Sequence, residues 1–325
     1  MSEHSFDGPF ADSLRDFLSA KRAAGRKYGS ELRLLDQMGR FFKTCRIERG
    51  ELSRQHVEAW IERRNGERPR TQNIRCTIIR QFAIFLRQRG GEAWVPPPRW
   101  GPPDRRVFSP YIFTHKEVRR FFDVIDHLEP HRCSARYHVA MPLLFRLLYC
   151  CGLRLGEALR LTPGDVNLSD GILTMRNSKF GKDRMIPVLG AIRERLAGYV
   201  ELRQPADSRS PLFMSCRKRA FHPAGVSAFH IRTVRQAGIP HRGRGDGPRV
   251  HDWRHTFAVH RLEEWIREGL DFTARLPALS AYLGHKDLHG TQLYLRLTAE
   301  VFPDLSKNMD ALIGSLIEGR DRDEA

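Results

Sequence analysis

A segment near the C-terminal end of the sequence carries residue types that could act on a phosphate. It begins HDWRHTFAVH and ends LSAYLGHKDLHGTQLYL. His251 and Arg254 are three residues apart, so on a helix they share one face. His285 follows Gly284, a residue suited to ending a helix, and Tyr294 lies nine residues later. A cationic pair, a second imidazole and a phenol suit an attack on an anionic, phosphate-bearing substrate.

The order H-x-x-R, then L-G-H, then a tyrosine resembles the tyrosine recombinase (phage integrase) family. The resemblance implies two more residues upstream, an arginine in a G-L-R-x-x-E helix and a lysine in a β-hairpin. Residues 152–157 read GLRLGE, which supplies Arg154. Residues 178–188 read SKFGKDRMIPV, where Lys179 matches best by position and Lys182 is the alternative. All five motifs stand in the family's order across most of the C-terminal two-thirds.

Two arginines and the tyrosine meet the main demand of phosphodiester cleavage. The transition state gathers negative charge on the non-bridging oxygens, so fixed cations are the main catalytic device. Arg154 and Arg254 suit this role because a guanidinium stays protonated and forks onto two oxygens. Tyr294 would be the nucleophile and would form a phosphotyrosyl enzyme. The bond energy is kept in that intermediate, so rejoining needs no ATP.

The proton transfers require further groups. The hydroxyl of Tyr294 has an ordinary pKa of about 10 and needs help to lose its proton. His251 is the expected base or base-positioning residue, Lys179 the general acid for the leaving 5′ oxygen, and His285 a hydrogen-bond partner of the phosphate. The resemblance implies cleavage that leaves a 3′-phosphotyrosine, strand exchange through a four-way junction and religation. It implies no metal and no nucleotide cofactor.

Several of these residues also have a purely structural explanation. Tyr294 stands between two leucines and could be a core aromatic residue. Arg154 could form a structural ion pair with Glu157, which could also orient it, and a lysine at a hairpin tip often serves only solubility. His260 and His289 are expected to be ordinary surface or packing residues.

A metal site is the least favoured interpretation of the histidines. His251 and His255 are four residues apart, as in a metalloprotease helix. That motif requires a glutamate directly after the first histidine, where this sequence has Asp252. Arg254 between the two histidines would be electrostatically adverse to zinc. A zinc hydrolase would lose its activity to a chelator, whereas a recombinase of this family would not.

Two other functional classes share parts of the pattern. A type IB topoisomerase relaxes DNA without exchanging partners, and a DNA-binding accessory protein could keep the fold without catalysis. The complete set of candidate residues argues against the accessory protein. The segment at 263–285 is longer than in compact integrases and is similar to recombinases encoded by transposon-like mobile elements. Integration, excision or transposition of such an element is therefore the expected role.

The composition is strongly basic. The 325 residues include 55 Lys and Arg against 38 Asp and Glu, a formal net charge of +17, with a pI near 10.2. A chain this basic usually meets a polyanion, and nucleic acid is the first candidate. The expected partner is double-stranded DNA with specific recombination sites. On DNA the resemblance implies a homo-oligomer, dimer to tetramer, with or without partner recombinases.

Cysteine usage and hydropathy indicate a cytoplasmic setting. The six cysteines form no C-x-x-C pair and mostly lie in apolar helical patterns, where a cysteine is usually a small buried hydrophobe. The opening MSEHSFDGPF is polar and acidic, unlike a signal peptide. No apolar run reaches membrane-spanning length, so no membrane contact is expected.

The periodicity predicts a mainly α protein with a small antiparallel sheet. Four amphipathic helical segments in residues 1–95 predict a helical bundle that the resemblance identifies as a core DNA-binding domain. A Pro/Gly-rich linker is expected at 96–110, and a tyrosine-recombinase catalytic domain at 111–325. An apolar helical stripe lies near the C-terminus, and the resemblance implies that a helix there docks on a neighbouring protomer. Six arginines could line a phosphate-facing surface of the bundle: Arg63, Arg64, Arg68, Arg70, Arg75 and Arg80.

Overall fold

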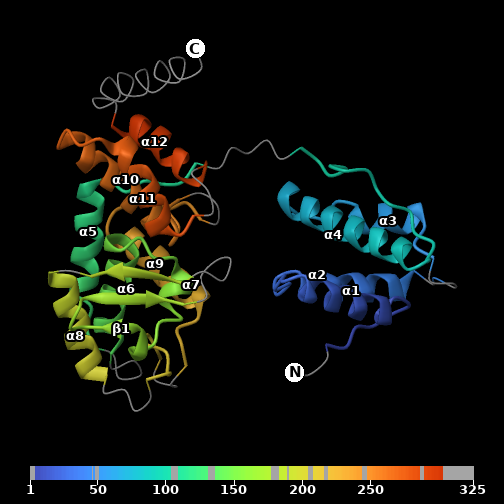
Figure 1. Ribbon diagram of the computed structural model, residues 1–325, viewed down its shortest axis with the longest axis horizontal. Helices are drawn as coiled ribbons and strands as arrows, with labels where there is room; N and C mark the ends of the chain where they lie inside the picture. The colour runs from blue at the N-terminus through green and yellow to red at the C-terminus, as the bar shows by residue number, and fades with distance from the viewer. Residues whose placement is uncertain are drawn as a thin grey trace. The chain divides into compact units, whose positions relative to one another are not determined.

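The computed structural model divides the chain into two compact units, Met1–Phe108 and Ser109–Ala325 (Figure 1). Each unit is described by itself. The residues that the structure describes are 4–45, 47, 51–103, 109–130, 136–176, 183–188, 190–203, 208–215, 219–243, 247–285 and 289–302. Lys179, Lys182 and the predicted C-terminal docking stripe lie outside these residues.

The N-terminal unit consists of four helices around an aromatic core. They are α1 (Ala11–Ala23), α2 (Leu32–Thr44), α3 (Arg54–Ile61) and α4 (Pro69–Gln88). The rings of Phe10 and Phe17 both pack edge-on against Phe82, with centroids 5.8 and 5.6 Å away. Such edge-to-face pairs add to the burial that holds the helices together. The predicted helical bundle is confirmed.

One of the six arginines expected on a phosphate-facing surface is inside the bundle instead. Arg75 is 1% exposed, and its Nη2 lies 2.6 Å from the carboxylate of Glu67. Its guanidinium also donates to the carbonyls of Trp60 and Glu62 at the end of α3. The prediction is therefore wrong for Arg75, because this side chain satisfies the last carbonyls of a neighbouring helix.

The segment after α4 folds back onto the four helices. Asn73 of α4 donates to the carbonyl of Pro102 over 3.0 Å, and Arg80 donates to the carbonyl of Pro96. Trp94 and Trp100 meet edge-on, with centroids 4.9 Å apart. At least residues 96–103 of the predicted linker thus contact the bundle.

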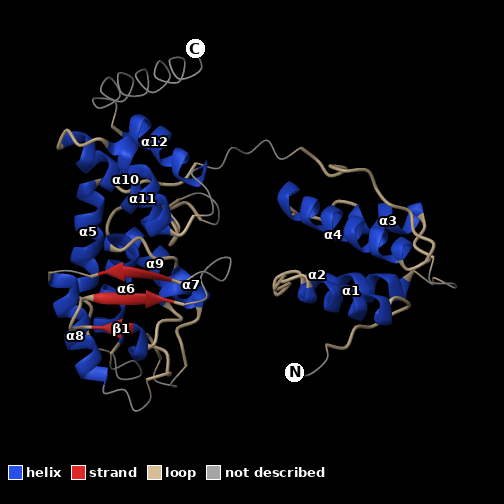
Figure 2. Cartoon of the chain, viewed as in Figure 1, coloured by secondary structure: helices blue, strands red, loops and turns tan. Residues whose placement is uncertain are grey.

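The C-terminal unit is helical with one small sheet (Figure 2). Its helices are α5 (His115–Asp126), α6 (Tyr137–Cys150), α7 (Leu155–Ala158), α8 (Ala191–Arg203), α9 (Pro223–Gln236), α10 (Asp252–Arg267), α11 (Phe272–Leu283) and α12 (His289–Val301). The antiparallel sheet has the order β1 (Val166–Asn167), β2 (Ile172–Met175) and β3 (Arg184–Pro187). Strands β2 and β3 pair as the hairpin that the resemblance implies, and the two-residue strand β1 is an addition. The predicted fold class, mainly α with a small antiparallel sheet, is confirmed.

Local signals mark where several of these elements begin and end. Thr114 and Glu117 form a capping box before α5, with the Glu117 carboxylate accepting from the Thr114 N–H over 2.8 Å. Gly284 ends α11 with φ +64°, a backbone conformation that favours glycine. Gly152, between α6 and α7, has φ +57°, and an added Cβ would lie 2.5 Å from the Phe257 ring. The positive φ of residue 152 and the nearby Phe257 ring thus both exclude a side chain at this position.

Helix α10 runs through the middle of this unit and packs against α6, α11 and α12. Trp253 in its first turn is fully buried and stacks on Phe113 with centroids 4.1 Å apart. Phe121 of α5 packs against the same indole at 4.5 Å. Trp253 is therefore a packing residue, and it fixes the helix start that carries His251 and Arg254.

Among the described residues, no helix combines the length and apolar character that a bilayer crossing requires.

Candidate active site

Arg254 ties together the three chain segments that the sequence motifs mark. Its side chain is 1% exposed, and Nη1 donates to the carbonyl of Gly152 over 2.7 Å. Nη2 donates to the carbonyl of Leu283, the last residue of α11. Burial, and after it the charge of Arg154, lowers the pKa of Arg254 to about 10. The guanidinium remains charged at neutral pH and is held rigidly at the start of α10.

Arg154 is the second guanidinium at this place. It stands just before α7 and donates to Glu157 over 2.7 Å and to the carbonyl of Gly284 over 3.1 Å. Its side chain is 22% exposed, so part of the guanidinium can meet a ligand. The ion pair with Glu157 that the sequence allowed is present, and it orients Arg154 toward the same segment that Arg254 contacts.

A third arginine completes this arrangement, and sequence reasoning missed it. Arg184, the first residue of β3, donates to the two carboxylate oxygens of Glu157 over 3.0 and 2.8 Å. Its Nε donates to the carbonyl of Tyr282 over 2.9 Å. Glu157 is 5% exposed and lies between the two arginines. Arg184 thus positions Glu157, which in turn positions Arg154.

The charge balance around Glu157 shifts its titration. Burial would raise the pKa of this carboxyl, but the hydrogen bonds from Arg184 and Arg154 outweigh burial and lower the pKa to about 2. A depressed carboxyl pKa stabilises the fold above the ordinary value of 4.5. That stabilisation is lost as the pH falls from about 4.5 to about 2.

We expect Glu157→Gln to be strongly destabilising, because it leaves two arginines close together with no buried carboxylate between them. Breaking a buried pair typically costs about 3–5 kcal/mol, and the pKa shift of Glu157 corresponds to about 3 kcal/mol. Urea unfolding at pH 7 measures the loss, with Glu194→Gln on the exposed face of α8 as the control. The difference between wild type and Glu157→Gln should shrink as the pH falls below about 4. A loss below about 1 kcal/mol at pH 7 would contradict this role.

Tyr294 lies on α12 beside these arginines. It is 2% exposed, and its ring faces that of His285 with centroids 5.9 Å apart and planes at 24°. Burial raises the pKa of the phenol and is the largest effect. The charge of Arg254, a hydrogen bond with Arg254 and the charge of Arg154 lower the pKa, but the net shift is upward. Tyr294 is therefore buried like a core residue, yet its hydroxyl meets the guanidinium of Arg254.

Two histidines at the start of α10 complete the group. His251 precedes the helix, and its ring meets that of His255 edge-on with centroids 4.9 Å apart. His255 in turn lies 5.6 Å from the Tyr294 ring. His251 keeps an exposed surface, but desolvation of the ring and then the charge of Arg254 lower its pKa to about 4. His251 is neutral at pH 7, the form that can accept a proton.

Five of the predicted site residues are thus brought together: Arg154, His251, Arg254, His285 and Tyr294. The position of the predicted lysine falls outside the described residues. His255 was considered only as a metal ligand, and its place beside the tyrosine was missed; the four-residue spacing from His251 was the available signal. Among the described residues, no third metal-ligating side chain joins His251 and His255.

Comparisons with known proteins identify the family of the chain. Residues 112–300 match the model of the phage integrase family. The protein y4rB of Sinorhizobium fredii, whose name describes an integrase or recombinase, is 27% identical over 310 residues, which cover 93% of this chain and 97% of y4rB. Tyrosine recombinase XerC of Erythrobacter litoralis is 32% identical over 231 residues, 71% of this chain and 70% of XerC.

A solved structure shares the fold. The Tn1549 transposon integrase in complex with a circular intermediate DNA superposes with a TM-score of 0.59 at 16% identity, covering 87% of this chain and 94% of the integrase chain. The family model spans more than half of the chain and includes the arginines, histidines and tyrosine described above. The chain therefore belongs to the phage integrase family, the tyrosine recombinases.

Proposed function

We propose that this protein is a site-specific DNA recombinase that cleaves and rejoins DNA through a 3′-phosphotyrosine intermediate. The observation that carries the proposal is the contact between the buried Tyr294 hydroxyl and the buried Arg254 guanidinium. A phosphate bound by Arg254 and by the exposed part of Arg154 would lie next to that hydroxyl.

The reaction follows from these positions. The Tyr294 oxygen attacks the phosphorus, forms a new P–O bond and displaces the 5′ oxygen of the next nucleotide. Arg154 and Arg254 stabilise the charge that develops on the non-bridging oxygens. His251, neutral at pH 7, takes the tyrosine proton, and Lys179 or Lys182 gives a proton to the 5′ oxygen. Rejoining is the same step in reverse, with a 5′ hydroxyl of the partner strand as nucleophile.

DNA is the proposed substrate, bound by a homo-oligomer of two to four protomers in the cytoplasm. The formal charge of +17 supports strongly salt-dependent DNA binding. Four of the six arginines predicted on a phosphate-facing surface are exposed: Arg63, Arg64, Arg68 and Arg70. The likeness to y4rB and to a transposon integrase supports a role in moving a mobile element.

An assay for strand exchange tests the proposal against a topoisomerase. Two duplexes of different length, each carrying sequence that flanks the protein's own gene, are incubated with the protein. We expect recombinant duplexes whose lengths are set by one crossover position. Relaxation of any supercoiled plasmid without recombinant duplexes would identify a topoisomerase. Binding of the duplexes with no cleavage at any site would identify a DNA-binding accessory protein and contradict the proposal.

A further inference from the structure

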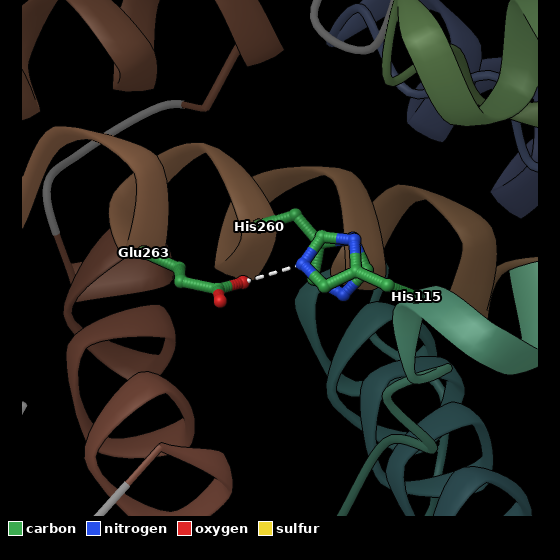
Figure 3. Close-up of side chains that lie close together, drawn as sticks. All are labelled: His115, His260 and Glu263. Carbon is green, nitrogen blue, oxygen red and sulfur yellow. Dashed lines mark hydrogen bonds and ion pairs between the residues drawn. The ribbon is translucent and has the colours of Figure 1, made fainter. Parts of the chain in front are cut away.

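A second cluster of chemically active side chains lies where the start of α5 meets the middle of α10 (Figure 3). It consists of His115, His260 and Glu263; one ring nitrogen of each histidine and one carboxylate oxygen all lie within 4.8 Å of one another. His115 Nε2 is 2.9 Å from Glu263 Oε2, and the two imidazoles stack with centroids 4.0 Å apart. None of these three side chains belongs to the proposed cleavage site.

Neighbouring groups hold two of the three side chains in place. The Tyr149 hydroxyl is 2.9 Å from Nδ1 of His260, and Arg267 Nη2 is 2.8 Å from Oε1 of Glu263. The contact with Arg267 takes one oxygen of Glu263 and leaves the other to His115. Nε2 of His260 is buried and forms no well-aligned hydrogen bond with the described residues. Outer partners of this kind orient the ligands of metal sites.

A cavity of about 510 Å³ opens beside the cluster and is lined by its three members together with Tyr149, Cys150 and Phe257. Glu263 is 3% exposed, whereas the His115 side chain is 50% exposed and can move. The site therefore combines two buried donors with one adjustable donor and has room for a water molecule at a fourth position.

The charges around this cavity favour a cation. Its lining holds two arginines, Arg261 and Arg267, and three glutamates, Glu263, Glu264 and Glu268, which gives a formal charge of −1 with neutral histidines. This local balance is opposite in sign to the net charge of +17 of the whole chain.

We propose that His115, His260 and Glu263 bind a zinc ion. Two imidazoles and a carboxylate form a donor set used by zinc when three protein ligands leave one position open, whereas magnesium and calcium prefer oxygen ligands alone. With metal–ligand bonds of about 2.0–2.1 Å, tetrahedral donors stand roughly 3.3 Å apart. The candidate donor atoms all lie within 4.8 Å of one another, and His115, which is half exposed, can reorient around an ion.

The ion would connect two elements that are distant in sequence. His115 is in the first turn of α5, while His260 and Glu263 lie on α10, the helix whose first turn carries Arg254. Bound zinc would brace α10 against α5 and stabilise the unit without touching the DNA phosphate. DNA cleavage by the proposed mechanism would persist in a chelator, so the two proposals are tested separately.

The test is a comparison of zinc binding by the full-length protein and its variants after dialysis against a chelator. Isothermal titration and thermal unfolding with ZnSO₄ are measured for wild type, His115→Ala, Glu263→Gln and the control His127→Ala. His127 is an exposed histidine at the other end of α5 that contacts Asp123 in its own turn. We expect wild type and His127→Ala to bind one zinc ion with similar affinity. His115→Ala should bind zinc at least about tenfold more weakly.

At a hundredfold excess over Kd, zinc should raise the unfolding temperature of wild type and His127→Ala by about 5–10 °C. The unfolding temperature of His115→Ala should not rise. His115 is half exposed, so this variant loses little packing, and circular dichroism verifies its fold. Cobalt in place of zinc should give visible absorption bands that Glu263→Gln weakens. The proposal is overturned if wild type binds no zinc near neutral pH, or if His115→Ala binds it with unchanged affinity.

Discussion

Tyr294→Phe is expected to abolish DNA cleavage and to leave both the fold and DNA binding intact. The substitution removes only the hydroxyl of a side chain that is 2% exposed, so the packing of α12 on α10 is kept. The lost hydrogen bond with Arg254 should cost about 1 kcal/mol of stability. The phenylalanine side chain has no oxygen that could attack the phosphorus. A nicked, labelled duplex incubated with each protein reports cleavage, and a mobility shift reports binding.

Tyr282→Phe is the matched control for this experiment. Tyr282 is on the neighbouring helix α11, and its ring stacks on Phe257 with centroids 5.8 Å apart. Its carbonyl, which Arg184 uses, is unchanged by the substitution. We expect Tyr282→Phe to cleave at a rate close to that of wild type. Loss of cleavage in Tyr282→Phe with cleavage retained in Tyr294→Phe would show that the wrong tyrosine was assigned.

Arg254→Lys is expected to lower the cleavage rate by about 10²–10³-fold, although the positive charge is kept. Arg254 uses its planar fork to hold the carbonyls of Gly152 and Leu283 while it meets the Tyr294 hydroxyl. A single ammonium cannot reproduce that geometry. Each buried carbonyl left without a donor should also cost about 1–3 kcal/mol of stability.

Single-turnover cleavage separates the catalytic loss from the structural one. Measured at a temperature where Arg254→Lys remains folded, its rate with saturating DNA reports the transition state alone. Arg261→Lys, on the same helix but 41% exposed, is the control and should cleave normally. Wild-type cleavage by Arg254→Lys would contradict the proposed role of this guanidinium.

Features set by neighbours in the chain could be predicted from the sequence. The capping box at Thr114, the helix end at Gly284 and the strands around the hairpin all depend on contacts within a few residues. Helical periodicity likewise located the helices of the N-terminal unit. The order of the motifs then pointed to residues that the fold brings together, although they are far apart in the chain.

Features set by contacts between distant residues could not be predicted in this way. The Arg184–Glu157 pair spans 27 positions, and nothing local distinguishes an arginine that begins a strand from one at the surface. Arg75 was misassigned for the same reason, since its partner carbonyls belong to another helix. His260 was expected to be an ordinary surface or packing residue, and only folding places it beside His115.

The most direct test of the central claim is to identify the amino acid that carries DNA in the covalent complex. Wild-type protein is incubated in EDTA with a nicked duplex from the sequence that flanks its gene, and the denaturation-resistant adduct is purified. Protease and nuclease digestion followed by tandem mass spectrometry then locates the attached nucleotide. The proposed mechanism predicts a nucleotide joined through its 3′ phosphate to Tyr294. A nucleotide on any other residue, or attachment through a 5′ phosphate, would contradict it.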